Sequence, residues 1–287
     1  MLKHYYKTEW NSHRFTYYTF PLILFLLAIL GLVSGCRPTV GLTIAGSTSV
    51  QPFAEILAEK YMQLNKVDVV NVQGGGSSAG IKSVETGTAD IGMSSRELTP
   101  DEQGLTVIPI AIDGIALIVH PSNPIQNLTL QQISDIYSGK IKKWNEVGGP
   151  SWQIHLVTRE EGSGTRSAFT DMVMKKVQID PTAIVQDSNG AVRQVVTGDK
   201  AAIGYISLGL VNSEVKAIAI DNVLPSKETI LNHDYTLWRR FLFLIKGQEN
   251  AAEKQFIDFT LSPDGQEILA REGLVPISSV TAGTVLR

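Results

Sequence analysis

Residues 159–166 place charged, hydroxyl and glycine residues together in one turn. The sequence there is Arg-Glu-Glu-Gly-Ser-Gly-Thr-Arg, and it lies between an apolar run and a helix-like run. An arginine that directly follows a strand can bind an oxyanion through two charge-assisted hydrogen bonds. The alternative is a surface arginine, Arg159, that pairs with Glu160 or Glu161. The segment is a candidate half of an anion-binding site.

Several other turns share this design, with small hydroxyl and glycine residues between an apolar strand and a helix. They are residues 46–49, 74–80, 94–95, 162–165 and 187–190. The first NH groups of a helix lack partners and carry partial positive charge, so such helix starts suit an anion. The alternative for each turn is a serine or threonine that only caps its own helix. Because ligands of α/β sheets bind beyond the carboxyl ends of strands, we favour a shared site.

Other kinds of site fit the sequence poorly. Residues 74–79 match a dinucleotide fingerprint, but Ser94 and Ser95 stand where its acidic residue would be. Residues 162–165 lack the lysine of a phosphate-binding P-loop. Histidines 120, 155 and 233 lie in no recognisable hydrolase context, and no histidine pair has metal-ligand spacing. We therefore expect no enzyme, no metal and no cofactor.

The turns need a sheet to position them, and the sequence predicts one. The chain has 287 residues, of which 43% are apolar and 18% charged, a globular composition. Apolar runs alternate with helical patterns, which favours helix-covered parallel sheets. We expect strands at residues 40–45, 67–72, 89–93, 105–109, 114–119, 154–158 and 183–186. We expect helices at residues 52–64, 81–85, 129–138, 165–176, 251–261 and 263–271.

The pattern restarts after a breaker-rich junction at residues 120–124, which indicates two lobes. A faint internal repeat, residues 78–92 against residues 188–204, supports two related α/β lobes. The expected fold is α/β, with two doubly wound lobes joined by crossover strands. We expect the first lobe to comprise residues 36–115 with 236–287, and the second lobe to comprise residues 116–235.

The N-terminus has the layout of a secretory signal. Three basic residues precede an almost purely apolar run at residues 20–32, and Ser34 and Gly35 stand directly before Cys36. These residues resemble the lipobox of bacterial lipoproteins, so we expect a signal peptide at residues 1–35 and lipid attachment at Cys36. The alternative is an uncleaved membrane anchor. Two acyl chains on one cysteine would hold the protein stably at a membrane.

The charge of the remaining chain excludes one class of partner. Residues 1–35 hold three basic residues and one acidic residue, so the chain's 25 basic and 28 acidic residues fall to 22 and 27, a net of about −5. No basic stripe is present, which argues against a nucleic-acid-binding protein. If the ligand is an anion, its attraction must be local.

The chain resembles the solute-binding protein of the bacterial ABC-type phosphate importer across nearly all of the sequence after residue 36. Five motifs in the order of that family carry the resemblance. They are residues 45–49, residues 76–80 with 89–92, residues 137–144 with 148–149, residues 159–165 and residues 202–205. The resemblance implies two lobes of the type II periplasmic-binding-protein kind that close around a dehydrated phosphate.

The same resemblance implies which residues bind the ligand and which partners take part. The ligand-binding residues are Thr48, Ser49 and Ser77 from the first lobe, and Arg159, Ser163, Gly164 and Thr165 from the second. Glu161 stands where family members have an aspartate that pairs with the arginine. The implied partners are phosphate, an ABC permease and a membrane reached through the lipid anchor, and the protein is expected to be a monomer facing the periplasm or cell exterior.

Ser95 departs from part of the family. Some members have an aspartate there, which accepts a hydrogen bond from protonated phosphate and disfavours sulfate, because sulfate has no proton to donate. If Ser95 faces the ligand, discrimination rests on Glu161 or another group. The nearest alternative is the same fold binding another tetrahedral oxyanion, such as sulfate, molybdate or arsenate. Two alternatives of other classes are a secreted phosphoryl-handling enzyme and a membrane-tethered sensor or adhesion protein.

Overall fold

The predicted first strand is present as β1 (Gly41–Gly46), and it begins the part of the chain that the structure describes. The structure is a computed structural model that describes residues 41–65 and 69–277. The predicted signal peptide and Cys36 lie outside the described residues. In β1, Leu42 and Ile44 are buried because alternate side chains of a strand face the same side.

The first lobe is built on a parallel arrangement of three strands. β1 lies between β2 (Val69–Gly74) and β3 (Ile91–Ser94) and pairs in parallel with both. The helices α2 (Gln51–Leu64) and α3 (Ser77–Thr86) connect these strands. Helix α2 buries Phe53, Leu57 and Tyr61, whose four-residue spacing produced the helix prediction.

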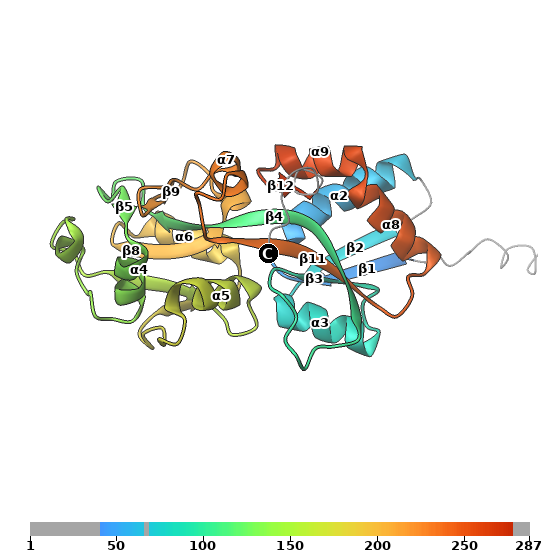
Figure 1. Ribbon diagram of the computed structural model, residues 1–287, viewed down its shortest axis with the longest axis horizontal. Coiled ribbons are helices and arrows are strands. Elements are labelled where there is room, and N and C mark those ends of the chain that lie inside the picture. The colour runs from blue at the N-terminus through green and yellow to red at the C-terminus, as the bar shows by residue number, and fades with distance from the viewer. Residues whose placement is uncertain (1–40, 66–68, 278–287) are drawn as a thin grey trace, which may run out of the picture. The chain divides into compact units, whose positions relative to one another are not determined.

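Two long antiparallel strands connect the lobes. β4 (Leu105–Val119) pairs with β11 (Trp238–Lys246), and the two run side by side in Figure 1. The middle of β4 also pairs with β12 (Val275–Pro276), and its last part pairs with β8 of the second lobe. The prediction of separate strands at residues 105–109 and 114–119 is wrong, because cross-strand pairing with β11 carries the chain through Asp113 and Gly114 without a break.

The second lobe continues the sheet. The strand order of the main path is β2-β1-β3-β11-β4-β8-β6-β7, with β8 (Ala202–Ser207), β6 (His155–Arg159) and β7 (Ile184–Gln186) on the second-lobe side. Its helices are α4 (Leu130–Tyr137), α5 (Gly164–Phe169), α6 (Asn189–Gly198) and α7 (Lys227–Leu231). Its smaller elements are β5 (Asn127–Leu128), η1 (Trp144–Val147), η2 (Thr170–Met174), η3 (Leu208–Leu210), β9 (Lys216–Ala217) and β10 (Ala219–Ile220). The predicted helix at residues 165–176 is therefore an α-helix followed by the π-helical turn η2.

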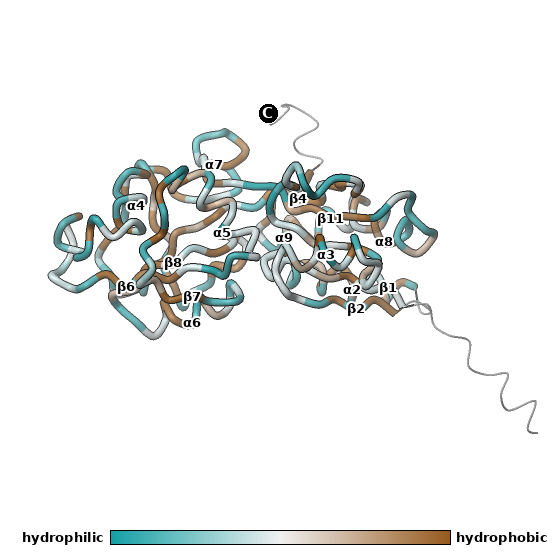
Figure 2. The backbone as a smooth tube through the Cα atoms, turned by 90° about the horizontal axis from the view of Figure 1, so that it is seen from below, coloured by the Kyte–Doolittle hydropathy of each residue, from teal (hydrophilic) through white to brown (hydrophobic). Residues whose placement is uncertain are grey.

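Each lobe has its own apolar core. In the second lobe, Tyr137, Phe169 and Tyr205 form an aromatic group with ring centroids 4.0 to 5.7 Å apart. In the first lobe, Phe243 and Phe256 pack in a separate cluster with the apolar residues of β1 and α2. Figure 2 shows apolar segments running mainly along the strands, with hydrophilic segments on the outer loops. Burial on this scale is the main stabilising contribution to each lobe.

The C-terminal helices pack against a helix of the first lobe. Helices α8 (Ala251–Leu261) and α9 (Pro263–Arg271) have the predicted bounds, and both contact α2. The predicted two-lobe α/β fold is confirmed. Within residues 41–65 and 69–277, no helix is both long and apolar enough to cross a membrane.

Candidate functional site

The hydroxyl-rich turns of the two lobes meet beyond the carboxyl ends of the strands. Ser49 in the first lobe and Thr165 in the second have their hydroxyl oxygens 2.6 Å apart. The Nη2 of Arg159 donates to the Thr48 hydroxyl over 3.0 Å. The backbone N–H of Ser78 donates to the Gly162 carbonyl over 3.1 Å. The structure thus brings together turns that are as far as 116 residues apart in sequence.

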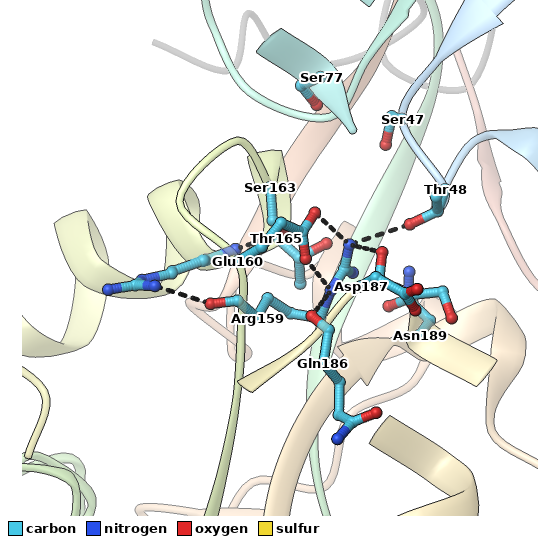
Figure 3. Close-up of polar contacts among 12 residues, drawn as sticks. Ser47, Thr48, Ser77, Arg159, Glu160, Ser163, Thr165, Gln186, Asp187 and Asn189 are labelled. Carbon is cyan, nitrogen blue, oxygen red and sulfur yellow. Dashed lines mark hydrogen bonds and ion pairs between the residues drawn. The ribbon is translucent and has the colours of Figure 1, made fainter. Parts of the chain in front are cut away.

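Arg159 is the charged residue of this site, and its side chain is 1% exposed. Its Nε and Nη2 donate to the two carboxylate oxygens of Glu160 over 3.0 and 2.9 Å, and also to the backbone carbonyls of Gln186 and Asp187. Figure 3 shows the guanidinium among these groups and Thr48. Its Nη1 is buried and has no hydrogen-bond partner among the described residues. A buried donor without a partner is costly, so this atom indicates an acceptor supplied by a ligand.

The predicted pairing of Glu161 with Arg159 is wrong, because Glu160 is the partner. The backbone N–H of Glu160 still bonds to the Gln186 carbonyl beside β6, and the Glu160 carbonyl accepts from Ser163 N–H as the chain turns. The Glu160 carboxylate therefore folds back onto the guanidinium. Glu161 lies at the tip of this turn and is exposed.

Ser95 lies inside the site, together with two other buried serines of the first lobe. The Ser47 hydroxyl donates to the Ser95 hydroxyl over 2.8 Å, and the backbone N–H of Ser95 donates to the Ser77 hydroxyl over 3.1 Å. A methyl group added at Gly164 would lie 2.3 Å from the Ser77 Oγ and 2.6 Å from the Ser95 Oγ. Glycine therefore allows the start of α5 to approach these serines closely.

The capping alternative holds for some of the hydroxyls and fails for others. Ser163 is the N-cap of α5, and its hydroxyl accepts from the backbone N–H of Arg166 over 3.3 Å. The N-cap residues of α2 and α3 are Val50 and Gly76, and neither helix has a side-chain cap. The hydroxyls of Ser49 and Ser77 are thus left for other partners. The remaining predicted residue, Cys36, lies outside the described part of the chain.

The backbone of Arg159 is held in place from the core of the second lobe. Its N–H donates to the Tyr205 hydroxyl over 3.4 Å, and its carbonyl accepts from Nη1 of Arg166 over 2.8 Å. The Tyr205 hydroxyl lies 2.6 Å from the Thr158 hydroxyl. Burial raises the pKa of Tyr205, so its hydroxyl stays protonated. These contacts fix the end of β6 and with it the position of the guanidinium.

Sequence reasoning missed three residues of this site, Ser47, Glu160 and Asn189. Ser47 and Asn189 belong to the turns at 46–49 and 187–190, so their place in those turns was the available signal. Asn189 is 1% exposed, and its Nδ2 donates to the Ser49 hydroxyl over 2.8 Å. The assembled donors are amides, hydroxyls and one guanidinium, which is paired with the Glu160 carboxylate. This donor set suits a small oxyanion. In the described part of the chain, no group of three or more histidine, cysteine, aspartate or glutamate residues could hold a metal ion.

Comparisons with known proteins agree with this geometry. The PBP superfamily domain matches residues 33–264. The phosphate-binding protein PstS of Bacillus subtilis is 31% identical over 245 residues, which is 83% of this chain and 81% of that protein.

The chain is also similar to solved structures of phosphate transport proteins. A protein from Clostridium perfringens, assigned as a phosphate ABC transporter substrate-binding protein and crystallised with bound phosphate, is 42% identical with a TM-score of 0.81, over 83% of this chain and 99% of that one. An ABC-type phosphate transport receptor from Vibrio cholerae is 39% identical with a TM-score of 0.69, over 82% and 99% of the two chains. The chain therefore belongs to the PBP superfamily and, within it, to the family of the PstS phosphate-binding proteins.

Proposed function

We propose that this protein binds inorganic phosphate on the outer side of the cytoplasmic membrane and delivers it to an ABC-type permease. The names of its relatives from Bacillus subtilis and Clostridium perfringens support phosphate as the ligand. The protein acts by binding, and it is not an enzyme. Its proposed ligand-binding residues are Thr48, Ser49, Ser77, Ser95, Arg159, Ser163, Gly164 and Thr165. Glu160, and not Glu161, is the carboxylate that pairs with Arg159.

The observation that carries this proposal is the buried guanidinium of Arg159, whose Nη1 lacks a partner among the described residues. Its charge is offset in part by Glu160 at 2.9 Å. The N-terminal ends of α3, α5 and α6 add partial positive charge around it. An anion that accepts from Nη1 and from the neighbouring hydroxyls would satisfy a donor that is otherwise costly to bury.

Binding proceeds by closure of the two lobes around the ligand. Contacts such as the Arg159–Thr48 and Ser49–Thr165 hydrogen bonds join the lobes, so only a closed form presents donors from both sides. A ligand that contacts both lobes shifts the equilibrium toward this form. The proposed lobe boundaries are residues 36–115 with 236–287, and residues 116–235. The course of β4 and β11 between the two cores supports these boundaries.

The proposed location is outside the cytoplasmic membrane, with residues 1–35 removed as a signal peptide and Cys36 carrying the lipid. The support is the order of basic, apolar and small residues before the single cysteine. We further propose that the protein is a monomer. Mass spectrometry of the protein isolated from membranes measures the N-terminal residue and its acyl mass, and an intact residue 1 would contradict the proposal.

The test is calorimetric titration with phosphate and, side by side, with sulfate at neutral pH. We expect phosphate binding by the wild-type protein and a loss of affinity of about 100-fold or more in Arg159→Ala, because a buried charged hydrogen-bonding group is removed. Arg159→Lys keeps the charge without the planar fork and should fall in between. Arg271→Ala, an exposed arginine on α9, is the matched control and should bind as the wild type does.

Two outcomes would contradict the proposal. Unchanged phosphate affinity in a folded Arg159→Ala protein would remove Arg159 from the site. Tighter binding of sulfate than of phosphate would assign the site to another tetrahedral oxyanion.

A further inference from the structure

Asn189 connects the two lobes at the candidate site, although it was not among the predicted ligand-binding residues. It begins α6 in the second lobe and is 1% exposed. Its Nδ2 donates to the Ser49 hydroxyl of the first lobe over 2.8 Å. Ser49 in turn lies 2.6 Å from the Thr165 hydroxyl. Asn189 is therefore one hydrogen bond away from a pair of hydroxyls that both belong to the proposed site.

The orientation of the Asn189 amide is fixed by its other neighbour. The backbone N–H of Ser207 lies 3.1 Å from Oδ1 of Asn189. A backbone N–H can only donate, so the amide oxygen must face Ser207 and the amide nitrogen must face Ser49. The orientation thus follows from the chemistry of the partner and does not depend on distinguishing oxygen from nitrogen.

Ser207 is itself anchored to the strands that join the lobes. Its hydroxyl donates to Oδ1 of Asp113 on β4 over 2.7 Å. The other carboxylate oxygen of Asp113 accepts from Nε and Nη2 of Arg239 on β11 over 3.2 and 3.0 Å. All three side chains are buried. A continuous chain of hydrogen bonds therefore runs from the crossover strands to Ser49 and Thr165.

This orientation determines how many hydroxyl protons the Ser49–Thr165 pair has left to donate. Each hydroxyl carries one proton, and one of the two protons lies between the two oxygens. Because Asn189 supplies its own N–H to Ser49, neither hydroxyl has to donate to Asn189. One proton of the pair therefore remains for the ligand, whichever hydroxyl carries it.

We propose that Asn189 is a positioning residue that makes the Ser49–Thr165 pair a hydrogen-bond donor to the bound oxyanion. The inference rests on the proposed function. A hydroxyl pair that donates a proton favours a phosphate oxygen that carries no proton at this side of the site.

Asn189→Asp is the variant that tests the proton count, because it changes the shape of the side chain little. A carboxylate at this position accepts from Ser49, so the Ser49 proton turns away from the ligand and Thr165 donates to Ser49. The pair then presents only lone pairs to the ligand, next to an added negative charge. A protonated phosphate can donate to these lone pairs, whereas the form without that proton is repelled.

The measurement is phosphate affinity by calorimetry at mildly acidic and mildly alkaline pH, on either side of the second ionisation of phosphate. We expect Asn189→Asp to lose about 10- to 100-fold in affinity at the alkaline pH and clearly less at the acidic pH. Asn189→Ala should lose affinity by a similar factor at both pH values. Asn232→Asp, an exposed residue after α7, adds the same charge and should match the wild type.

Apart from the carboxylate that Asn189→Asp adds, the charged groups around this hydroxyl pair are the same in every variant, so their own titration cancels in the ratio of variant to wild-type affinity. They are Arg159 with Glu160 beside β6, and Asp113 with Arg239 on the crossover strands. An equal loss at both pH values in Asn189→Asp would overturn the inference and leave the proposed function intact. A wild-type protein that binds no phosphate at either pH would refute the proposed function and the inference with it.

The contact itself is measured in the phosphate affinity, because the two lobes of the ligand-free protein can separate. The phosphate affinities of Ser49→Ala, Asn189→Ala and the double variant at the alkaline pH form a cycle with the wild type. We expect the affinity loss of the double variant to be smaller than the product of the two single losses, because the two side chains share one hydrogen bond. A loss equal to that product would contradict the Asn189–Ser49 contact and with it the inference.

Discussion

Glu160 and Glu161 are neighbours of the same type, yet only one of them belongs to the site. The Glu160 carboxylate receives two hydrogen bonds from Arg159, at 3.0 and 2.9 Å, while Glu161 is exposed at the tip of the turn. A two-point contact between a guanidinium and a carboxylate fixes both groups in one plane. Glu160 therefore orients the guanidinium, and the remaining donor, Nη1, is left for the ligand.

At the level of single residues we predict that Glu160→Gln weakens phosphate binding by about 10-fold. The glutamine side chain has one acceptor oxygen in place of two and no negative charge, so it cannot accept both hydrogen bonds from the guanidinium. Glu161→Gln is the matched control on the next residue, and it should change affinity by less than about twofold. Titration calorimetry on both variants measures the difference. The reverse ranking would return the orienting role to Glu161.

Helices α3, α5 and α6 begin at the site, and their first residues differ in what they do. Helix α5 is capped by Ser163 and α6 by Ser188, whereas α3 begins at Ser77 without a side-chain cap. The first residue of α5, Gly164, lies against Ser77 and Ser95 of the other lobe. The lack of a side chain at Gly164 therefore matters for closure, because the approach is between lobes and not within one.

At the level of the helices we predict that Gly164→Ala weakens phosphate binding by about 10-fold or more, because the added methyl group overlaps Ser77 and Ser95 in the closed form. The unfolding temperature of the ligand-free protein should change little, since the lobes can separate. Gly190→Ala in the first turn of α6 is the control, because a methyl group there meets open space. Equal affinities for the two variants would argue against closure over Gly164.

The two lobes are joined through a buried ion pair on the crossover strands. Asp113 on β4 and Arg239 on β11 are cross-strand partners with side chains that are 0% and 4% exposed. The guanidinium of Arg239 also lies 5.3 Å from the ring centre of Phe241. Desolvation of both charges offsets much of their attraction, so the pair contributes more to the geometry of the strands than to net stability.

At the level of the whole molecule we predict that Arg239→Met lowers the free energy of unfolding by about 3–5 kcal/mol, because it leaves Asp113 buried without its counter-charge. Adding Asp113→Asn to this variant should recover part of the loss, since no isolated charge remains. Arg240 is also on β11, and it forms an exposed ion pair with Glu97. Arg240→Met should lower the free energy of unfolding by at most about 1 kcal/mol. Denaturant unfolding measures all three, and a double variant less stable than Arg239→Met would contradict the argument.

The sequence by itself determined many of the helices and strands, and it marked the turns that carry the chemistry. Helical and strand periods are local properties, so α8 and α9 were predicted at their observed bounds, and the glycine and hydroxyl turns marked where a ligand could bind. The motifs around Arg159 also pointed to the family to which the chain belongs.

Only the tertiary structure decided which side chains act together. Ser49 meets Thr165 and Asn189 across 116 and 140 residues of sequence, and no local pattern encodes such distances. The choice of Glu160 over Glu161 depends on how the chain turns after β6 against β7, and the unbroken course of β4 depends on its pairing with β11. Local periodicity specifies the elements, whereas hydrogen bonds between distant segments select the partners within the site.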